Sequence, residues 1–451
     1  MSQTKPLNIA IVGSGISGLS CAWLLSQKHQ VTLFEQGSRL GGHSNTVDVQ
    51  TTQGQFAVDT GFIVFNKANY PNLLALFKAL EVSITPTNMS FAVSLDQGSL
   101  EYCGSGLKGL LAQPANAVKP SFIGMVRDIL RFYKIATTAM EQLDDTVTLE
   151  QFLQQGGYGQ AFINQHLLPM GAAIWSTPMD KMLGYPARTF LRFCNNHGLL
   201  QLKKRPQWYS VTGGSRTYVN QLSRKVNGKI IKNCGIRQIS RIGDKVHMLD
   251  SMGQKWQFDQ VVLAIHADQA LQLLVEPRTE EIELLRHFRF ERNRAVLHSD
   301  IGLMPKRKSV WSCWNYMGNS KDTDHSLSVS YHMNQLQKLN TEQPLIVTLN
   351  PFIEPNNDMV HASYLYEHPV FDCNTIKAQR RLWQLQGKHR IWFCGAWCGY
   401  GFHEDGLQAG LTVAEALGQV HRPWLIDQMN DRLSLPDNWP NNIKLNHSPF
   451  T

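Results

Sequence analysis

Three glycines and one carboxylate near the N-terminus are spaced to bind a dinucleotide. The motif Gly13-Ser-Gly-Ile-Ser-Gly18 follows an apolar run, and Glu35 ends the next apolar run. In such a motif the glycines allow a tight turn, close approach of a pyrophosphate, and close packing of the following helix on the sheet. The helix N-terminus then stabilises the phosphates, and the carboxylate binds a ribose. A glycine-rich turn that binds nothing is the alternative, and the position of Glu35 argues against it. The residues assigned to this site are Gly13, Ser14, Gly15, Ile16, Gly18, Glu35 and Gln36.

A second glycine pair follows directly. Gly41 and Gly42 lie between Arg39 and His43, so their backbone is suited to form another cradle for the same diphosphate. An ordinary basic hairpin is the alternative. These motifs alone leave both NAD and FAD open as the dinucleotide.

A third glycine-rich loop lies near the C-terminus, between a predicted strand at 390–394 and a predicted helix at 407–417. It contains Gly395 and the acidic pair Glu404 and Asp405. A helix N-terminus here would receive the ribityl hydroxyls of a flavin or the electron-rich edge of its ring. His403 and Glu404 are the candidate catalytic residues, because a histidine in such a loop is suited to proton transfer. The alternative is that both residues only hold the loop.

Other clusters predict less specific chemistry. Cys394 and Cys398 lie near His403, but structural zinc needs four ligands, so we expect no metal site. The basic clusters 203–205 and 306–308 indicate solvated loops or, if they share a face, attraction to anionic lipid at about 1 kcal/mol per residue. Nothing repeats the basic and aromatic interleaving of a nucleic-acid groove, so we expect no nucleic-acid partner. Three aromatic residues could line a substrate cavity or belong to the core: Trp175, Trp397 and Tyr400.

The elements that must position these residues are those of an α/β protein. Residues 7–12, 16–26 and 31–34 predict a strand, a helix and a second strand, which together form a βαβ unit. Residues 107–200 are mostly helical in pattern. Nucleotide-type strands return at 230–240, 245–249 and 260–265, and a further strand-rich stretch covers 295–349. Nucleotide-type elements therefore occur at both ends and in the middle, which predicts discontinuous domains.

Composition limits the class of protein. The chain has 451 residues, 43% hydrophobic and 17% charged, with a net charge of +8. This excludes a disordered chain or a coiled coil and allows a large core. The eight cysteines are too sparse for a disulfide framework, so we expect reduced thiols in a cytoplasmic protein. Residues 6–27 lack charge, but their glycines and serines favour the strand-turn-helix over a membrane span.

Together, the N-terminal motif, the Arg39 loop, residues 58–62 and residues 393–407 make the chain resemble the FAD-dependent amine oxidase-like superfamily. That group includes monoamine and polyamine oxidases, phytoene-type desaturases and protoporphyrinogen oxidase. Residues 89–94 and 401–406 most resemble a bacterial branch of NAD/FAD-binding proteins linked to cyclopropane- and furan-fatty-acid genes. The amine oxidases usually have Arg where this chain has His43, and we see no clear counterpart of their aromatic cage or lysine. Both departures weaken the case for an amine substrate.

The resemblance implies a two-domain α/β fold. A doubly wound, Rossmann-like FAD-binding domain would comprise 1–75, 205–290 and 385–420, and a substrate domain with a helical part and a mixed sheet would comprise 76–204 and 291–384. Residues 421–451 would form a tail on the surface, without a core of its own.

The resemblance also assigns residues to parts of FAD. The diphosphate would lie on Gly13, Ser14, Gly15 and Gly18 with the loop at Arg39, Gly41, Gly42 and His43, and Glu35 would bind the adenosine ribose. Further contacts would come from Thr60 and Gly61 at the isoalloxazine, from the backbone of Ile236 at the adenine, and from Gly395, Glu404, Asp405 and Leu407 at the ribityl chain and pyrimidine edge.

The implied activity is hydride transfer to FAD during oxidation or desaturation of an apolar small molecule or lipid, with a methyl-branched or unsaturated fatty acyl chain favoured. An amine oxidase, a redox-neutral double-bond isomerase and a non-catalytic flavin-binding protein are the alternatives. The electron acceptor stays open. We expect a cytoplasmic protein with peripheral contact to the inner face of the membrane.

Overall fold

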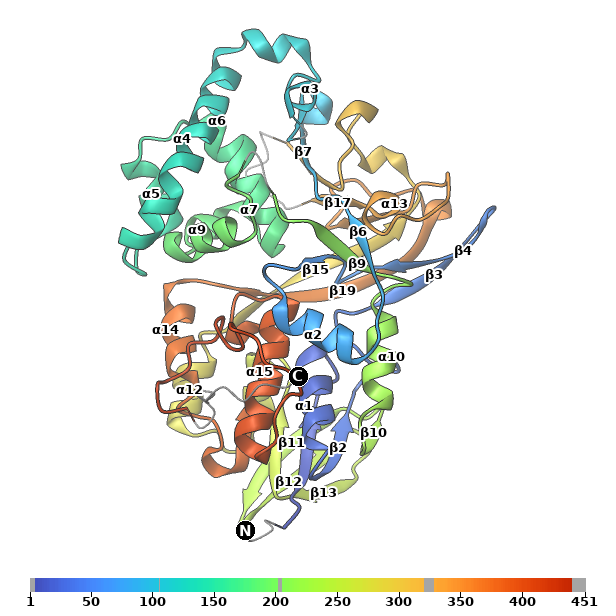
Figure 1. The fold of residues 1–451 in the computed structure, drawn as a ribbon, viewed down its shortest axis with the longest axis vertical. Coiled ribbons are helices and arrows are strands. Elements are labelled where there is room, and N and C mark those ends of the chain that lie inside the picture. Colours follow the sequence, from blue (N-terminus) through green and yellow to red (C-terminus); the bar gives the residue numbers. More distant parts are fainter. Residues whose placement is uncertain (1–4, 105, 202–204, 320–327, 440–451) are drawn as a thin grey trace, which may run out of the picture.

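The computed structural model describes residues 5–104, 106–201, 205–319 and 328–439. Its elements form an elongated molecule with two halves (Figure 1). The lower half contains both described chain ends, and the upper half contains a group of helices beside a sheet. Lys203 and Lys204 of the predicted basic cluster lie outside the described residues.

A parallel five-stranded sheet forms the centre of the lower half. Its strand order is β10-β2-β1-β14-β20. β1 is buried along almost its whole length, as expected of a parallel strand covered on both faces. All five strands lie within the three segments assigned from the sequence to the FAD-binding domain. Their bounds are β1 Asn8–Val12, β2 Gln30–Phe34, β10 Lys229–Ile231, β14 Gln260–Leu263 and β20 Ile391–Phe393.

Two layers cover this sheet. Helices α1 (Ile16–Leu25) and α15 (His403–Gly418) pack on each other, with Gly410 in direct contact with the backbone of Ser17. An antiparallel sheet packs on β2 through the ring contacts of Phe34 with Trp256 and Phe258. Its strands are β11 (Ile236–Ile242), β12 (Lys245–Asp250) and β13 (Lys255–Phe258).

The single strand expected over 230–240 is therefore wrong. Residues 229–231 join the parallel sheet as β10, while 236–242 form β11 of the antiparallel sheet. The chain turns between them because the backbone of Cys234 bonds to Glu35 and that of Asn233, at φ 55°, bonds to Gly37.

A mixed seven-stranded sheet forms the centre of the upper half, in the order β19-β15-β18-β17-β16-β7-β8. Its two longest strands, β15 and β19, cross the molecule between the halves (Figure 1). The bounds are β7 Phe91–Leu95, β8 Leu100–Cys103, β15 Arg289–His298, β16 Trp314–Gly318, β17 Val329–His332, β18 Ile346–Leu349 and β19 Val360–Val370.

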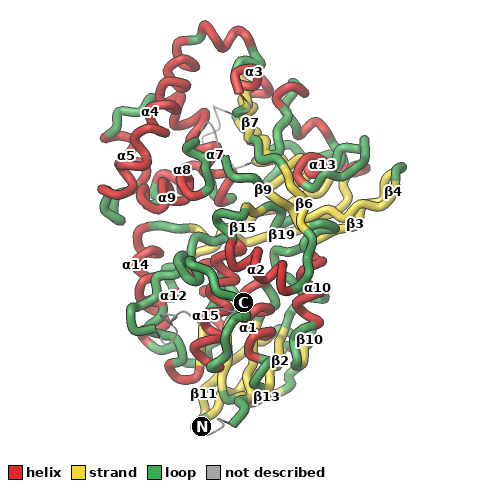
Figure 2. Tube along the Cα trace, viewed as in Figure 1, coloured by secondary structure: helices red, strands yellow, loops and turns green. Residues whose placement is uncertain are grey.

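Helices gather on one side of this sheet, as Figure 2 shows. The longest, α4 (Pro120–Gln142), buries Phe122, Met125, Ile129 and Phe132 at helical spacing, so one stripe faces the core. The others are α3 Gly106–Leu110, α5 Leu149–Gln155, α6 Gln160–Phe162, α7 Leu168–Trp175, α8 Met179–Leu183 and α9 Ala187–Asn196. A short 3-10 turn lies at Pro114–Val118, and a π-helical segment, Ile163–Leu167, joins α6 to α7.

Smaller elements connect the halves. The hairpin β3–β4 and the three-stranded sheet β5-β9-β6 lie where the chain passes between the two cores. Their bounds are β3 Thr46–Thr51, β4 Gly54–Asp59, β5 Phe65–Asn66, β6 Ile84–Thr87 and β9 Trp208–Val211. The remaining α-helices of the described chain are α2 Pro71–Ala79, α10 Arg216–Arg224, α11 Ala267–Leu273, α12 Thr279–Leu285, α13 Met333–Leu336 and α14 Cys373–Leu382.

Residues 421–439, the described part of the predicted tail, have no separate core but anchor in the lower core rather than only covering the surface. Leu433 and Trp439 are buried in the lower core, and Trp424 stacks on Trp23 of α1. Arg422 is buried and pairs with Glu415 of α15. The pattern of Pro, Asn and Trp did not reveal these anchors, because each is an isolated residue without periodicity.

No helix in the described ranges is both long and apolar enough to cross a membrane.

Candidate cofactor and substrate site

A cavity of about 700 Å³ lies between the two halves. Three parallel strands of the lower sheet end at it, since Gly13, Ala264 and Gly395 follow β1, β14 and β20 and all line the cavity. Open α/β sheets bind ligands in the crevice outside the carboxyl ends of their strands. Residues of the upper sheet and helices form the opposite wall.

The first glycine loop has the geometry of a phosphate cradle. Gly13 has φ +100°, and a Cβ atom there would lie 2.6 Å from the oxygen of Ala264. A Cβ atom on Gly18 would lie 1.9 Å from the oxygen of Gly13, so this glycine permits the close packing of α1. A Cβ atom on Gly15 would meet no atom within 4 Å. Gly15 lines the cavity, so the space beside it is the space that a pyrophosphate needs.

The second glycine loop lies against the first. A Cβ atom on Gly42 would approach the Cα atom of Gly15 to 3.2 Å, and the amide of Gly41 donates to the carbonyl of Ser14 at 3.0 Å. The cavity is lined here by Ser14, Ile16, Gln36, Arg39, Gly41 and Gly42. Two backbone loops and a helix N-terminus thus surround one end of the cavity, which fits the diphosphate of FAD.

Glu35 fixes this arrangement and also lines the cavity. Its carboxylate accepts hydrogen bonds from the amide and the hydroxyl of Ser14, at 3.1 and 2.5 Å, and from the amide of Gly37 at 2.8 Å. The residue predicted to bind a ribose therefore also orders the phosphate loop.

Thr60 and Gly61 line the cavity next to His43. A Cβ atom on Gly61 would lie 2.2 Å from the oxygen of His43, so the two loops touch. The hydroxyl of Thr60 bonds to the hydroxyl of Tyr366 at 2.7 Å, which joins this wall to β19. The ring of His43 lies 5.1 Å from that of Tyr366, and its Nε2 atom is buried without a hydrogen-bond partner. An unsatisfied ring nitrogen at this wall fits a polar cofactor edge.

Three more histidines line the same part of the cavity: His266, His368 and His403. Burial lowers the pKa of His43 to about 4 and that of His368 to about 3. His266 bonds through Nδ1 to Glu367 at 3.1 Å and stacks on Phe290. The site therefore presents neutral imidazoles at neutral pH.

His403, one of the two candidate catalytic residues, lines the cavity and is held on three sides. Its Nε2 atom bonds to the hydroxyls of Ser44 at 2.9 Å and Tyr218 at 2.7 Å, and its ring stacks on Phe62 at 3.7 Å. Burial lowers the pKa of His403 to about 3, so its imidazole is uncharged near neutral pH. The geometry favours a positioning role over that of a charged acid.

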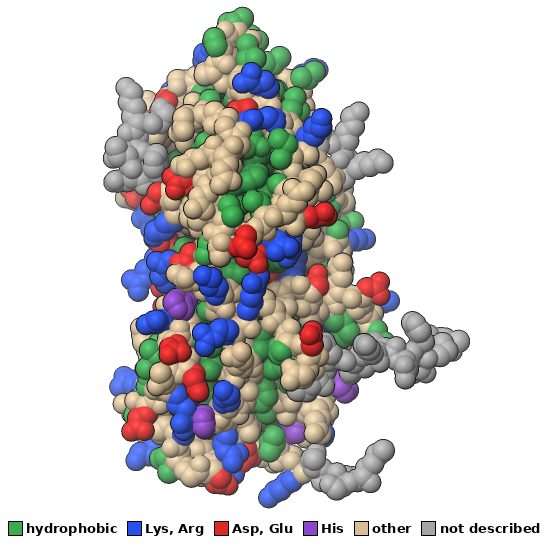
Figure 3. All heavy atoms as spheres, turned by 90° about the vertical axis from the view of Figure 1, so that its left-hand side faces the viewer, with side chains coloured by type: hydrophobic (Ala, Val, Ile, Leu, Met, Phe, Trp, Pro, Cys, Tyr) green, Lys and Arg blue, Asp and Glu red, His purple; other side chains and the backbone are tan. Residues whose placement is uncertain are grey.

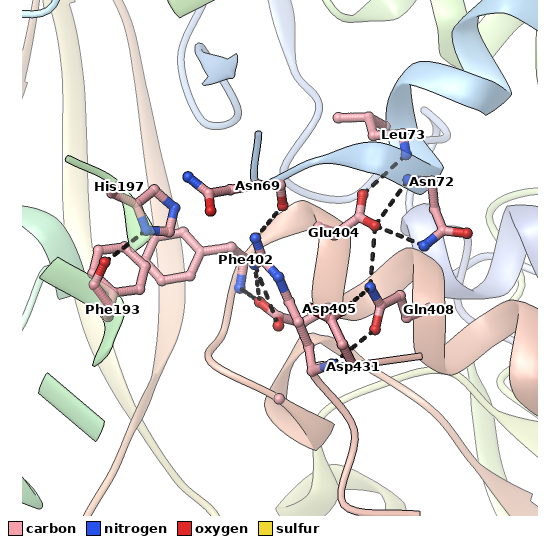
Figure 4. Close-up of polar contacts among 12 residues, drawn as sticks. Asn69, Asn72, Leu73, Phe193, His197, Phe402, Glu404, Asp405, Gln408 and Asp431 are labelled. Carbon is pink, nitrogen blue, oxygen red and sulfur yellow. Dashed lines mark hydrogen bonds and ion pairs between the residues drawn. The ribbon is translucent and has the colours of Figure 1, made fainter. Parts of the chain in front are cut away.

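Glu404 does not line the cavity, which corrects the expectation that it faces the cofactor. Its buried carboxylate accepts from the backbone amides of Asn72 and Leu73, both at 2.9 Å, and from the side chains of Asn72 and Gln408 (Figure 4). These contacts hold the N-terminus of α2 against α15, which is a structural role.

Asp405 and Leu407 are also fully buried outside the cavity lining. The carboxylate of Asp405 accepts from the amide of Phe402 at 2.8 Å (Figure 4). It also pairs with Arg432 of the tail. Gly18 is also outside the cavity lining and packs against the backbone of Gly13. Ile236 begins β11 and lies outside the lining, although the neighbouring Gly235 touches Gln36.

The other end of the cavity is apolar and aromatic. The acidic residues that line the cavity, Glu35 and Glu367, both belong to the cofactor end. Arg205 lies at the opposite end. Trp175 and Trp397 line the cavity and also belong to the cores, while Tyr400 only packs beside it. The apolar side chains of this end are Ile63, Val64, Phe91, Tyr102, Tyr133, Met170, Ala173, Ile174, Phe193, Leu199, Trp208, Trp314, Tyr331 and Leu349.

Sequence reasoning missed several lining residues. His266 follows β14 at the same sheet edge as Gly13, so the carboxyl-end rule was a usable signal. Tyr364, Tyr366 and His368 alternate along β19 and so share one face, but the strand itself was not predicted. Arg205 belongs to a basic cluster, and its sequence context indicates only a solvated loop or attraction to lipid.

Among the residues that the structure describes, no group of three His, Cys, Asp or Glu side chains could hold a metal ion.

Comparisons with known proteins agree with this geometry. The family model for flavin containing amine oxidoreductases matches residues 16–418. A relative from Mycobacterium tuberculosis, whose assigned name is flavin-containing monoamine oxidase AofH, is 23% identical over 256 residues, which is 55% of this chain and 54% of the relative. The chain thus spans about half the length of the curated relatives it matches.

Solved structures share the fold. A CLA-producing fatty acid isomerase from P. acnes matches with a TM-score of 0.63 and 15% identity, over 91% of this chain and 98% of that one. Putrescine oxidase with bound putrescine gives 0.64 and 14% over the same shares. Cyclohexylamine oxidase from Brevibacterium oxydans gives 0.64 and 13%, over 92% and 99%. With the family model covering most of the chain and a cavity that fits FAD, the protein belongs to the FAD-dependent family of flavin-containing amine oxidoreductases.

Proposed function

We propose that this FAD-dependent oxidoreductase oxidises or desaturates an apolar substrate, with a methyl-branched or unsaturated fatty acyl chain as the favoured one. The observation that carries this proposal is the apolar, aromatic end of the cavity, which continues from the cofactor end without an intervening carboxylate. An acyl chain loses hydration on entering such a surface, and that loss drives binding.

The chain's own residues bind, orient and exclude water, while bound FAD supplies hydride acceptance. Gly15, Gly42 and Glu35 would hold the diphosphate and ribose, and the wall of His43 and Thr60 would meet the ring. The hydrogen bonds of His403 to Ser44 and Tyr218 keep that wall in place.

Arg205 suits an acidic acyl substrate. It is exposed, lies beyond the apolar end, and lines both the cavity and a second hollow of about 430 Å³ that shares Met89, Ser90 and Gly104 with it. A guanidinium there would attract a carboxylate or phosphate head while the chain extends inward.

An amine substrate has less support. Glu367 already makes a hydrogen bond with His266 and an ion pair with Arg292, so it is not free to hold an ammonium group. The names of the family and of its relatives still make amine oxidation the first alternative.

Anaerobic reduction of the bound flavin tests these proposals. We expect fatty acyl lipids, and not primary or secondary amines, to bleach the oxidised flavin absorbance. Lipid extracted from cells with and without the protein should differ in one acyl species. Bleaching by amines alone would overturn the proposal.

Redox-neutral double-bond isomerisation is the second candidate, favoured by the shared fold with a fatty acid isomerase and by the same apolar end. It predicts a fatty acid with a shifted double bond and no lasting loss of flavin absorbance.

A further inference from the structure

One end of the upper half exposes apolar and basic side chains together. We define the distal face as Leu107, Lys108, Val118, Lys119, Ile123 and Arg127, from α3, the turn Pro114–Val118 and the start of α4. Leu107 is 76% exposed, Val118 79% and Ile123 53%. Isolated exposed apolar residues are common, but here they follow one another along consecutive elements at the top of the molecule in Figure 1.

Basic residues alternate with them. Four residues of α4 follow one another at steps of four, three and four positions: Ile123, Arg127, Leu130 and Lys134. This spacing places them on one face of the helix, and all four are exposed. Figure 3 shows hydrophobic and basic side chains together at this end. An apolar stripe edged by lysine and arginine is the pattern of a helix that lies in a bilayer interface.

Acidic residues are scarce along the same segment. Between residues 102 and 140 the only carboxylate is that of Asp128, which is buried, accepts from the amide of Gly159 and pairs with Arg131. Glu101, just before the segment, is fully buried and pairs with Arg307. The distal face therefore carries positive charge, and no exposed carboxylate between residues 102 and 140 compensates for it.

The same elements lead into the cavity. Tyr102 and Gly104, directly before α3, and Tyr133 of α4 line its apolar end. The second hollow at this end is lined by Arg205 and by Trp311, over whose ring Lys308 lies at 5.9 Å.

From these observations we propose that the distal face docks the enzyme on an anionic lipid bilayer, with Leu107, Val118 and Ile123 among the acyl chains and Lys108, Lys119 and Arg127 at the lipid phosphates. The charge pattern favours anionic lipid over a protein partner or a second copy, because it offers positive charge along a continuous apolar edge. The proposal rests on exposure and charge, so it holds whichever substrate the cavity takes.

Co-sedimentation of the holoenzyme with vesicles tests this docking. We expect binding to phosphatidylcholine vesicles that contain phosphatidylglycerol, weaker binding to pure phosphatidylcholine, and release by salt. The double variant V118S/K119E should bind anionic vesicles more weakly by a factor on the order of tenfold. Its flavin absorbance should be unchanged, because neither residue lines the cavity.

A matched control variant loses one apolar and one basic residue at a site away from the distal face. M252S/K255E changes an exposed pair at the β12–β13 turn, at the opposite end of the molecule, and should bind vesicles like the wild type. The proposal is overturned if the wild type binds neutral vesicles as well as anionic ones. It is also overturned if both variants lose vesicle binding equally, or if the wild type sediments with neither kind of vesicle. A dimer in size-exclusion chromatography that only V118S/K119E dissociates, without vesicle binding, would also overturn it and assign the face to a second copy.

Discussion

Gly15 and Gly18 are three residues apart, yet their surroundings differ completely. A side chain on Gly15 would project into open cavity, whereas one on Gly18 would collide with the backbone of Gly13. The same motif thus contains one glycine that serves the ligand and one that serves the fold.

Substitution separates these two roles. G15V should fold with a loss of only about 1 kcal/mol from its helix N-cap position, but should lose bound flavin. G18A should instead lower the thermal midpoint of the protein. Flavin absorbance and thermal unfolding measure the two effects, and a G15V protein that retains its flavin would contradict the phosphate-cradle assignment.

His197 is a buried histidine whose charge state affects stability. Burial lowers its pKa to about 3, its ring stacks on Phe193 at 3.8 Å, and its Nε2 atom has no partner. In the unfolded chain the imidazole takes up a proton near its ordinary pKa of 6.5, while in the folded chain it does not. This residue therefore costs stability as the pH falls below about 6.5.

The variant H197F should remove that cost. The loss of unfolding free energy between pH 7 and pH 5 should be smaller than in the wild type by about 2 kcal/mol. Chemical denaturation at both pH values measures the difference, and an unchanged difference would mean that His197 is protonated in the fold.

Adjacent residues in a motif need not share a site. His403 and Glu404 were predicted together, but successive residues of a helix point about 100° apart, so only one of them reaches the cavity. The loop can be predicted from the sequence, but the direction of each residue around the helix decides which of the two side chains lines the cavity.

At the level of elements, α15 joins α2 and the tail. Glu404 binds the first turn of α2, Asp405 binds Arg432, and Glu415 binds Arg422. Three buried acids on one helix thus hold two segments from opposite ends of the chain.

E404Q should lower the unfolding free energy by about 2 kcal/mol, because its amide would face donors that now meet a buried carboxylate. The rate of flavin reduction by the substrate should not change. The exposed Glu283, changed to Gln on α12, provides the control and should alter neither quantity. A slower flavin reduction in E404Q with normal stability would restore its predicted catalytic role.

Elements with strong periodicity could be predicted from the sequence, and those held by long-range pairing could not. The βαβ unit of β1, α1 and β2 and the long helix α4 follow from apolar spacing. The sequence of β19 does not alternate between apolar and polar residues over its whole length, and it contains Pro369. Its extended form therefore depends on pairing with β15.

At the level of the whole molecule, the cavity connects two separate cores. Its lining comes from segments as distant as Gly13, Tyr133, Arg205 and His403. The glycine motifs made the cofactor end predictable, but the apolar end depends on how the helices pack above the sheet, which no local pattern contains.

A ligand bound in the cavity between the two cores should stabilise both halves of the molecule together. Each tenfold rise in free FAD above its dissociation constant should add about 1.4 kcal/mol to the stability of the apoprotein. Thermal midpoints at several FAD concentrations measure this effect, with G15V as the control that should show no shift. A wild-type midpoint that stays constant while FAD binding saturates would contradict a cofactor site between the cores.

The cysteines have a practical consequence for labelling. All eight lie in the described chain and are free thiols, and seven are buried, while Cys373 at the start of α14 is partly exposed. Burial raises the pKa of Cys21, Cys194, Cys394 and Cys398 and also that of Cys373, so the accessibility of its thiol sets Cys373 apart. A maleimide dye added to the native protein should therefore attach at Cys373 first, giving a single fluorescent reporter without any engineered cysteine.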